Sequence, residues 1–186
     1  SDRSNQPMVD PELGQALVFN GAIYNYRELR RELLAKGYRF SSEGDTEVIL
    51  KAYAEWGEAC VEHLIGMFAF ALWNRRERTL FLARDRLGIK PLYYSRTAHA
   101  FRFASNSQAL LEAPEVDTAI DPVALHQQLT LHAVIPAPRT ILRGIRKLAP
   151  ATTLTLDAQG NERQRVYWRL TAQRPAQPHT EAEWTE

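Results

Sequence analysis

Short apolar runs bounded by polar turns recur along the chain, and they predict a sheet-rich fold with a few helices. The most apolar runs are residues 16–19, 67–73 and 80–83. In 67–73 the two faces of an extended strand are both apolar, because Phe68 and Phe70 alternate with Ala69 and Ala71. Such a strand is covered on both sides, so we expect its sheet inside a layered fold. The charged residues 74–79 join the last two runs as a hairpin.

Helical spacing of apolar residues follows several capping signals. Asn25 is expected to cap a helix over 26–36, and Asp45 a second helix that ends before Gly57. Phe40 is assigned to a short strand between them. The remaining expected elements are a short helix carrying Cys60, strands at 92–95 and 101–104, helices at 108–112 and 123–131, and a closing hairpin of 152–156 with 163–168.

Composition fits one globular domain and nominates no partner by charge. Of 186 residues, 45% are hydrophobic and 24% charged, which suffices for one core. A formal net charge of +1 gives no field that favours nucleic acid or a membrane, and no apolar run approaches the roughly 20 residues that span a bilayer. The single cysteine, Cys60, excludes an internal disulfide and a multi-cysteine metal site. We therefore expect a soluble, cytoplasmic protein with no metal site in this chain.

The last residues differ in character from the rest. Pro175 and Pro178 interrupt a polar stretch without apolar periodicity, which is typical of a linker. Thr180 and Glu183 then have the spacing of a capping box at a helix start. We expect a domain over residues 1–170, with 171–186 forming a linker and the start of a following domain.

Two positions suggest chemistry. Asn20 followed by Gly21 after a buried strand can offer a side-chain NH2 and a backbone N–H to one oxygen atom, which is the composition of an oxyanion hole. The alternative is an ordinary Asn-Gly turn. Asp45 is equally open, since a helix cap needs no ligand.

The chain resembles the class II glutamine amidotransferase domain of glutamine-hydrolysing asparagine synthetases. The matching phrases occur in the family's order up to about Trp168 and read Gln-Pro-Met at 6–8, Phe-Asn-Gly-Ala-Ile-Tyr-Asn at 19–25, Asp-Thr-Glu-Val at 45–48, Gly-Met-Phe-Ala-Phe-Ala-Leu-Trp at 66–73 and Leu-Ala-Arg-Asp-Arg-Leu-Gly-Ile-Lys-Pro-Leu-Tyr-Tyr at 82–94. Within the family, 117–152 looks closest to N-acetylglutaminylglutamine amidotransferase.

The resemblance implies an α+β N-terminal-nucleophile hydrolase fold, a four-layer αββα arrangement with two stacked antiparallel sheets. It also implies an N-terminal cysteine that attacks the side-chain amide of glutamine, forms a thioester and releases ammonia. By similarity, Asn20 and the N–H of Gly21 stabilise the oxyanion, and Asp45 pairs with the α-ammonium group of glutamine. The implied partner is a synthetase domain of the same polypeptide, which uses ATP and magnesium to amidate a carboxylate.

Three departures from the family pattern qualify this hypothesis. The family's nucleophile and its carboxylate-binding arginine precede the Gln-Pro-Met phrase and are not in the sequence, so we expect an N-terminally truncated domain that is inactive alone. Ala22 stands at a substrate-binding position where the family usually has glutamate. No glycine-rich phosphate loop occurs, so we expect no cofactor in this chain. The alternative function is a scaffold without activity, and exposed sheet edges predict a homo-oligomer.

Overall fold

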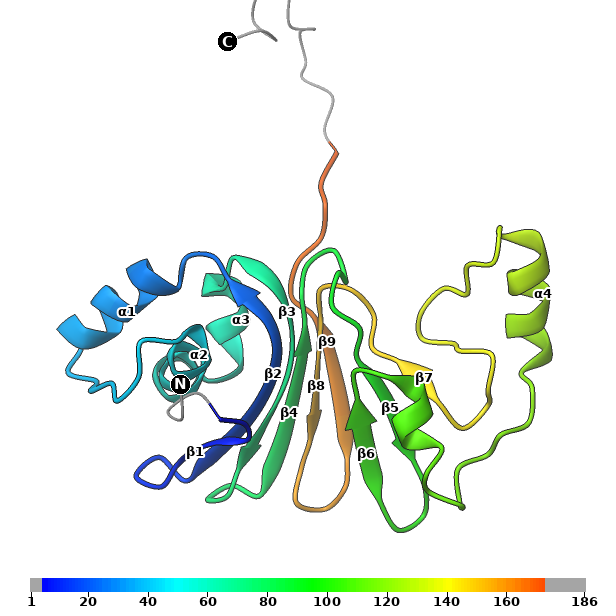
Figure 1. Cartoon of the computed structure of the whole chain (residues 1–186), viewed down its shortest axis with the longest axis horizontal. Helices are drawn as coiled ribbons and strands as arrows, with labels where there is room; N and C mark the ends of the chain where they lie inside the picture. The colour runs from blue at the N-terminus through cyan, green and yellow to red at the C-terminus, as the bar shows by residue number, and fades with distance from the viewer. Residues whose placement is uncertain (1–4, 173–186) are drawn as a thin grey trace, which may run out of the picture.

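The computed structural model describes residues 5–172, which form two antiparallel sheets packed face to face (Figure 1). The larger sheet has the strand order β1-β2-β3-β4-β8-β9, and the smaller has the order β6-β5-β7. The strands of the larger sheet are β1 (Met8–Asp10), β2 (Gln15–Ile23), β3 (Gly66–Asn74), β4 (Thr79–Arg84), β8 (Thr152–Leu156) and β9 (Glu162–Val166). Those of the smaller sheet are β5 (Tyr93–Arg96), β6 (Phe101–Ala104) and β7 (Arg146–Lys147).

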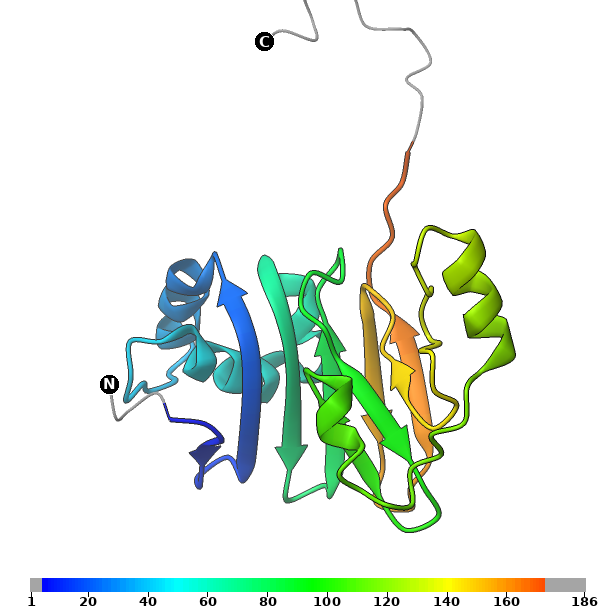
Figure 2. The same cartoon turned by 45° about the vertical axis from the view of Figure 1, so that its right-hand side comes forward.

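Helices lie outside both sheets and complete an αββα order of layers (Figures 1 and 2). The outer face of the larger sheet is covered by α1 (Tyr26–Ala35), α2 (Asp45–Trp56), the 3₁₀ turn η2 (Gly57–Ala59) and α3 (Cys60–His63). On the side of the smaller sheet lie η3 (Ser107–Leu110) and α4 (Pro122–Thr130). This arrangement confirms the expected fold class.

The core has a compartment on each face of the larger sheet. Phe68, Phe70 and Leu72 of β3 pack among α1, α2 and α3, whereas Ala69 and Ala71 of the same strand pack against the smaller sheet. The small alanine side chains let the two sheets approach, and the large side chains fill the space under the helices. The prediction that this strand is covered on both sides is therefore confirmed.

Several predicted elements have other boundaries or other partners. Phe40 lies in no strand; its ring packs against the helical core instead. Asn25 holds the predicted N-cap position of α1, but its side chain makes no capping bond; it donates to the carbonyl of His63 (2.9 Å) and accepts from the N–H of Ile65 (2.9 Å). The capping box at 180–183 and the linker at 173–179 lie outside the described residues.

The turn that follows β4 is organised by one carboxylate. Asp85 is 1% exposed and accepts hydrogen bonds from the N–H groups of Leu87, Ile89 and Lys90. It also accepts from the N–H of Phe68 (3.2 Å), which ties this turn to β3. This one carboxylate therefore fixes the geometry of the turn.

Candidate active site

The predicted Asn-Gly turn is in fact part of a strand. β2 continues through Asn20 and Gly21 to Ile23, with Gly21 paired opposite Phe68 of β3. Gly21 has φ +151°, and a Cβ added there would lie 2.1 Å from the carbonyl oxygen of Met67. Only glycine fits this position, because any side chain would collide with the backbone of β3.

The outer edge of β2 carries the backbone groups of alternate residues. In an antiparallel ladder the N–H and C=O of alternate residues point to opposite neighbours. Leu17 is paired with Met8, the first residue of β1. Phe19, Gly21 and Ile23 therefore direct their backbone groups to the same edge as Leu17, but beyond the segment that β1 covers. Among the described residues, no strand pairs with this part of the edge of β2.

Side chains occupy this edge on both sides of Gly21. The Oε1 atom of Gln6 accepts from the N–H of Phe19 (2.6 Å), and its Nε2 atom donates to the carbonyl of Phe19 (2.8 Å). The Oδ2 atom of Asp45 accepts from the N–H of Ile23 (3.0 Å). Within the described residues, the N–H of Gly21 has no side-chain acceptor, so it is the one of these three N–H groups that remains available to a ligand.

Asn20 lies on the other side of the strand from the helical core. It is exposed and lines a cavity of about 340 Å³ between the two sheets, together with Val18 and Gln6 on one side and Phe103 and Ser105 on the other. The alternation of β2 places Ala22 on the same face as Asn20. The structure thus brings Asn20, Gly21 and Ala22 together at one end of β2.

Asp45 has a different local role from the one predicted. It is the first residue of α2, and Gly44 holds the cap position without a side-chain hydrogen bond. Its carboxylate instead reaches 22 residues back along the chain to the N–H of Ile23. Oδ1 makes no hydrogen bond to any described residue. All four residues that the sequence nominated therefore meet around the end of β2.

Sequence reasoning assigned no role to Gln6 or to Glu47. Glu47 is 5% exposed, and its carboxylate accepts from the backbone N–H groups and hydroxyls of Ser41 and Ser42, at 2.6 to 3.2 Å. These bonds shape the loop that leads into Asp45. A pair of serines ahead of an Asp-x-Glu helix start is the sequence signal that points to such a clamp.

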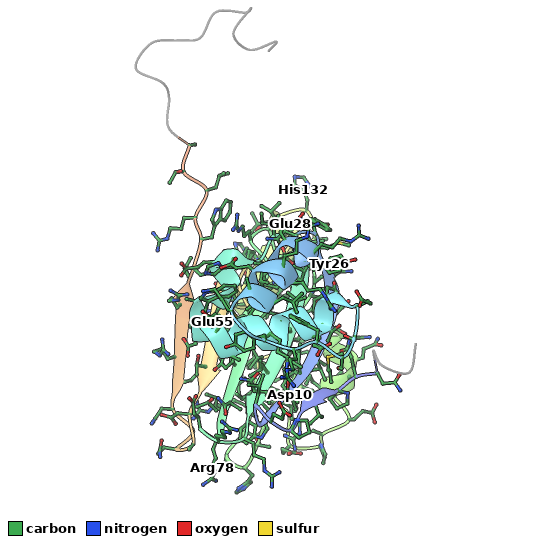
Figure 3. The ribbon with its side chains drawn as sticks, turned by 90° about the vertical axis from the view of Figure 1, so that its left-hand side faces the viewer. Asp10, Tyr26, Glu28, Glu55, Arg78 and His132 are labelled. Atoms are coloured by element: carbon green, nitrogen blue, oxygen red, sulfur yellow. The ribbon has the colours of Figure 1, made fainter. Side chains whose placement is uncertain are left out.

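A larger cavity of about 960 Å³ lies between β1 and α2, away from Asn20. In its wall, the buried Lys51 of α2 forms an ion pair with the partly buried Asp10 of β1. Burial raises the pKa of Asp10, but the hydrogen bond and charge of Lys51 together with backbone hydrogen bonds from Leu13 and Glu12 outweigh it and leave the pKa below its usual value. Figure 3 shows Asp10 below α2 on the helix side of the sheet. This pair joins β1 to α2.

Two classes of site are not found in the described part of the chain. Over residues 5–172, no group of three or more His, Cys, Asp or Glu residues is arranged to hold a metal ion. In the same residues, no helix is long and apolar enough to cross a membrane.

The αββα order of layers with two stacked antiparallel sheets is the N-terminal-nucleophile hydrolase fold. A family model described as "glutamine amidotransferase domain" matches residues 1–168. The chain therefore belongs to the glutamine amidotransferase domain family.

Curated relatives agree with this family. Asparagine synthetase [glutamine-hydrolyzing] 3 of Bacillus subtilis is 38% identical over 171 residues, which are 91% of this chain and 28% of that protein. A putative asparagine synthetase [glutamine-hydrolyzing] of Mycobacterium tuberculosis is 48% identical over 136 residues, 71% of this chain and 21% of that protein. The chain thus spans about a quarter of the length of these relatives.

A solved structure with similar architecture is that of a glutamine phosphoribosylpyrophosphate amidotransferase from B. subtilis, with a TM-score of 0.60 at 18% identity. The match covers 89% of this chain and 32% of that one. A second, titled as the allosteric regulatory enzyme of purine biosynthesis, gives a TM-score of 0.57 at 19% identity over 83% of this chain and 28% of the other. At these identities the likeness shows the fold.

Proposed function

We propose that this chain is the glutaminase part of an ATP-dependent amidotransferase, which hydrolyses glutamine and supplies ammonia to amidate a carboxylate. The observation that carries the proposal is the edge of β2. There the N–H of Gly21 lies between those of Phe19 and Ile23, which are hydrogen-bonded to side chains, and next to the side chain of Asn20. Family membership and the named relatives support the same reaction.

In the proposed reaction, a thiolate attacks the side-chain carbonyl carbon of glutamine, and negative charge develops on the carbonyl oxygen. The N–H of Gly21 and the side-chain NH2 of Asn20 stabilise that oxygen; each such donor is worth about 10²- to 10³-fold in rate. As the intermediate collapses, the proton lost by the thiol passes to the leaving nitrogen, so ammonia is released and a thioester remains, which water hydrolyses to glutamate and the free thiol.

Asp45 and Ala22 are proposed to border the substrate's amino group. With Oδ2 held by Ile23, the carboxylate of Asp45 keeps a fixed position and can direct Oδ1 to an ammonium group. Ala22 offers no charge, so Asp45 supplies the carboxylate attraction alone.

The thiolate is proposed to come from a residue outside this sequence. Its single cysteine, Cys60, has 0% exposure and lies in the helical core, where burial raises the pKa of the thiol. A neutral buried thiol is neither reactive nor within reach of substrate. We therefore propose that these 186 residues do not hydrolyse glutamine alone.

The proposed partner is a synthetase domain in the same polypeptide, which would hold ATP and magnesium and consume the ammonia in the cytoplasm. The relatives are named as asparagine synthetases and are much longer than this chain. The subtype suggested by 117–152, N-acetylglutaminylglutamine amidotransferase, stays a prediction.

The test is glutamate formation from glutamine by the longer protein that carries this chain. Asn20→Ala is expected to lower kcat by about 10²- to 10³-fold, while Asp45→Asn is expected mainly to raise the KM for glutamine. Asn161→Ala, in the exposed β8–β9 turn, is the matched amide control and should leave both constants unchanged. Synthesis from free ammonia should persist in every variant.

One observation favours a second candidate, a scaffold without glutaminase activity. Ala22 replaces the family's usual glutamate at the site, and a domain that no longer binds glutamine tolerates this loss. A wild-type protein that synthesises product from ammonia but releases no glutamate from glutamine would establish the scaffold and reject the glutaminase.

A further inference from the structure

We propose that Gln6 is a positioning residue for the oxyanion-binding strand edge, an inference that rests on the proposed function. Both polar atoms of its side chain hydrogen-bond to the backbone of Phe19, the residue directly before Asn20. Gln6 acts through this backbone and does not need to touch the substrate.

The register of the sheet explains why a side chain does this work. β1 pairs with β2 as Met8 opposite Leu17, so the same register continued places Pro7 opposite Val18 and Gln6 opposite Phe19. β1 begins only at Met8, so the backbone of Gln6 does not continue the ladder with β2. The carboxamide of Gln6 therefore supplies the donor and the acceptor that a strand neighbour would have presented to Phe19.

The consequence for the site lies two residues further along β2. Phe19 is held by Gln6 and Ile23 by Asp45, so the segment between them, Asn20 to Ala22, is fixed at both ends. Gly21 lacks a side chain and adopts φ +151°, so the bonds of its neighbours determine its orientation. Losing the Gln6 bonds lets the N–H of Gly21 and the side chain of Asn20 move relative to the reacting oxygen, and misplacement by about 1 Å costs about 10²-fold in rate.

Gln6 is exposed, so replacing it removes no core packing. In the longer protein, Gln6→Ala is expected to lower the glutaminase kcat by about 10- to 100-fold, with a change in the KM for glutamine of less than about threefold, because Asp45 still stands at Ile23. Gln6→Glu should also lower kcat. A carboxylate can accept from the N–H of Phe19, but it has no donor for the carbonyl of Phe19. Gln159→Ala, an exposed residue between β8 and β9, is the matched control.

A double-mutant cycle separates positioning from a general structural effect. If Gln6 acts by aiming the donors, Gln6→Ala should cost much less in an Asn20→Ala background than in the wild type. Equal losses in both backgrounds, or a Gln6→Ala variant with wild-type kcat, would overturn the inference. An inactive wild type would instead reject the proposed function, and an Asn20→Ala loss without a Gln6→Ala loss would reject only the role of Gln6.

Discussion

The loop ahead of α2 is held by a single buried carboxylate, and replacing Glu47 by glutamine tests that arrangement. Glu47 accepts from two backbone N–H groups and two hydroxyls, contributed by Ser41 and Ser42. Glutamine has the same shape but keeps only one acceptor oxygen. Its NH2 group replaces an oxygen that accepts from serine donors, so at least one of the present hydrogen bonds is lost in a site that is 5% exposed.

Hydrogen bonds to a charged group contribute about 1.5 to 3 kcal/mol each, and an unsatisfied buried donor carries a cost of similar size. We expect Glu47→Gln to lower the free energy of unfolding by about 2 kcal/mol, which for a chain of this length lowers Tm by about 4 to 8 °C. Because the loop leads into Asp45, the KM for glutamine in the longer protein should rise as well.

The pH dependence has a definite sign. Burial raises the pKa of Glu47, but the hydrogen bonds from Ser42 and Ser41 outweigh it, so the pKa in the folded chain lies below its usual value. A lowered folded-state pKa contributes stability that is complete above the unfolded value of about 4.3 and is lost as the pH falls through the folded value. The stability gap between wild type and Glu47→Gln should be constant from about pH 8 to about pH 5 and should narrow below about pH 4.

Urea unfolding followed by circular dichroism measures this gap at each pH. Glu43→Gln is the control, because its side chain lies in the same loop at 93% exposure and makes only a surface ion pair with Arg30, so a change below about 0.5 kcal/mol is expected. A Glu47→Gln midpoint equal to that of Glu43→Gln at pH 7, or a gap that widens in acid, would refute the clamp.

Three further outcomes follow from the fold. Gly21→Ala should lower the free energy of unfolding in urea by more than about 3 kcal/mol, because its Cβ would collide with the backbone of Met67. The control Gly160→Ala, also at positive φ but in open space, should lower it by about 1 kcal/mol. Equal losses would contradict the steric argument. The buried thiol of Cys60 should react with a thiol reagent only after denaturant is added, and rapid labelling of the native chain would contradict its burial. The 186-residue chain should form dimers or larger assemblies in light scattering, because β1 and β6 are outer strands of their sheets and apolar side chains such as Leu129 (77% exposed) face solvent; a monomer at high concentration would count against this.

Local sequence patterns predicted the parts of the fold that local physics determines. The strand over 67–73 is apolar on both faces because it lies between two layers, and the runs at 80–83 and 152–156 alternate with turns that close hairpins. Each of these features is complete within a few residues. The boundaries of α2 follow in the same way from apolar spacing and from Gly57.

Contacts between distant residues explain the errors. Asn25 has the composition of a helix cap, but its side chain bonds His63 and Ile65, some 40 positions away. Asp45 has the same composition and bonds Ile23 instead. An Asn or Asp side chain satisfies whichever backbone group the tertiary fold leaves unpaired, and the sequence pattern does not show which group that is.

Whether the domain is an enzyme or a scaffold depends on whether a carboxylate from one face of β2 is enough to bind the ammonium group of glutamine. Ala22 shares the face of Asn20, toward the smaller sheet, whereas Asp45 reaches the end of the strand from the helical layer. A glutamate at position 22 would therefore add a second carboxylate from the opposite side of the strand. In the proposed site, with alanine at position 22, the ammonium group of glutamine would meet one carboxylate, and the position of Asp45 would matter correspondingly more. The bond from Asp45 to Ile23 and the loop shaped by Glu47 fix the position of that carboxylate, as the proposed glutaminase with this substitution requires.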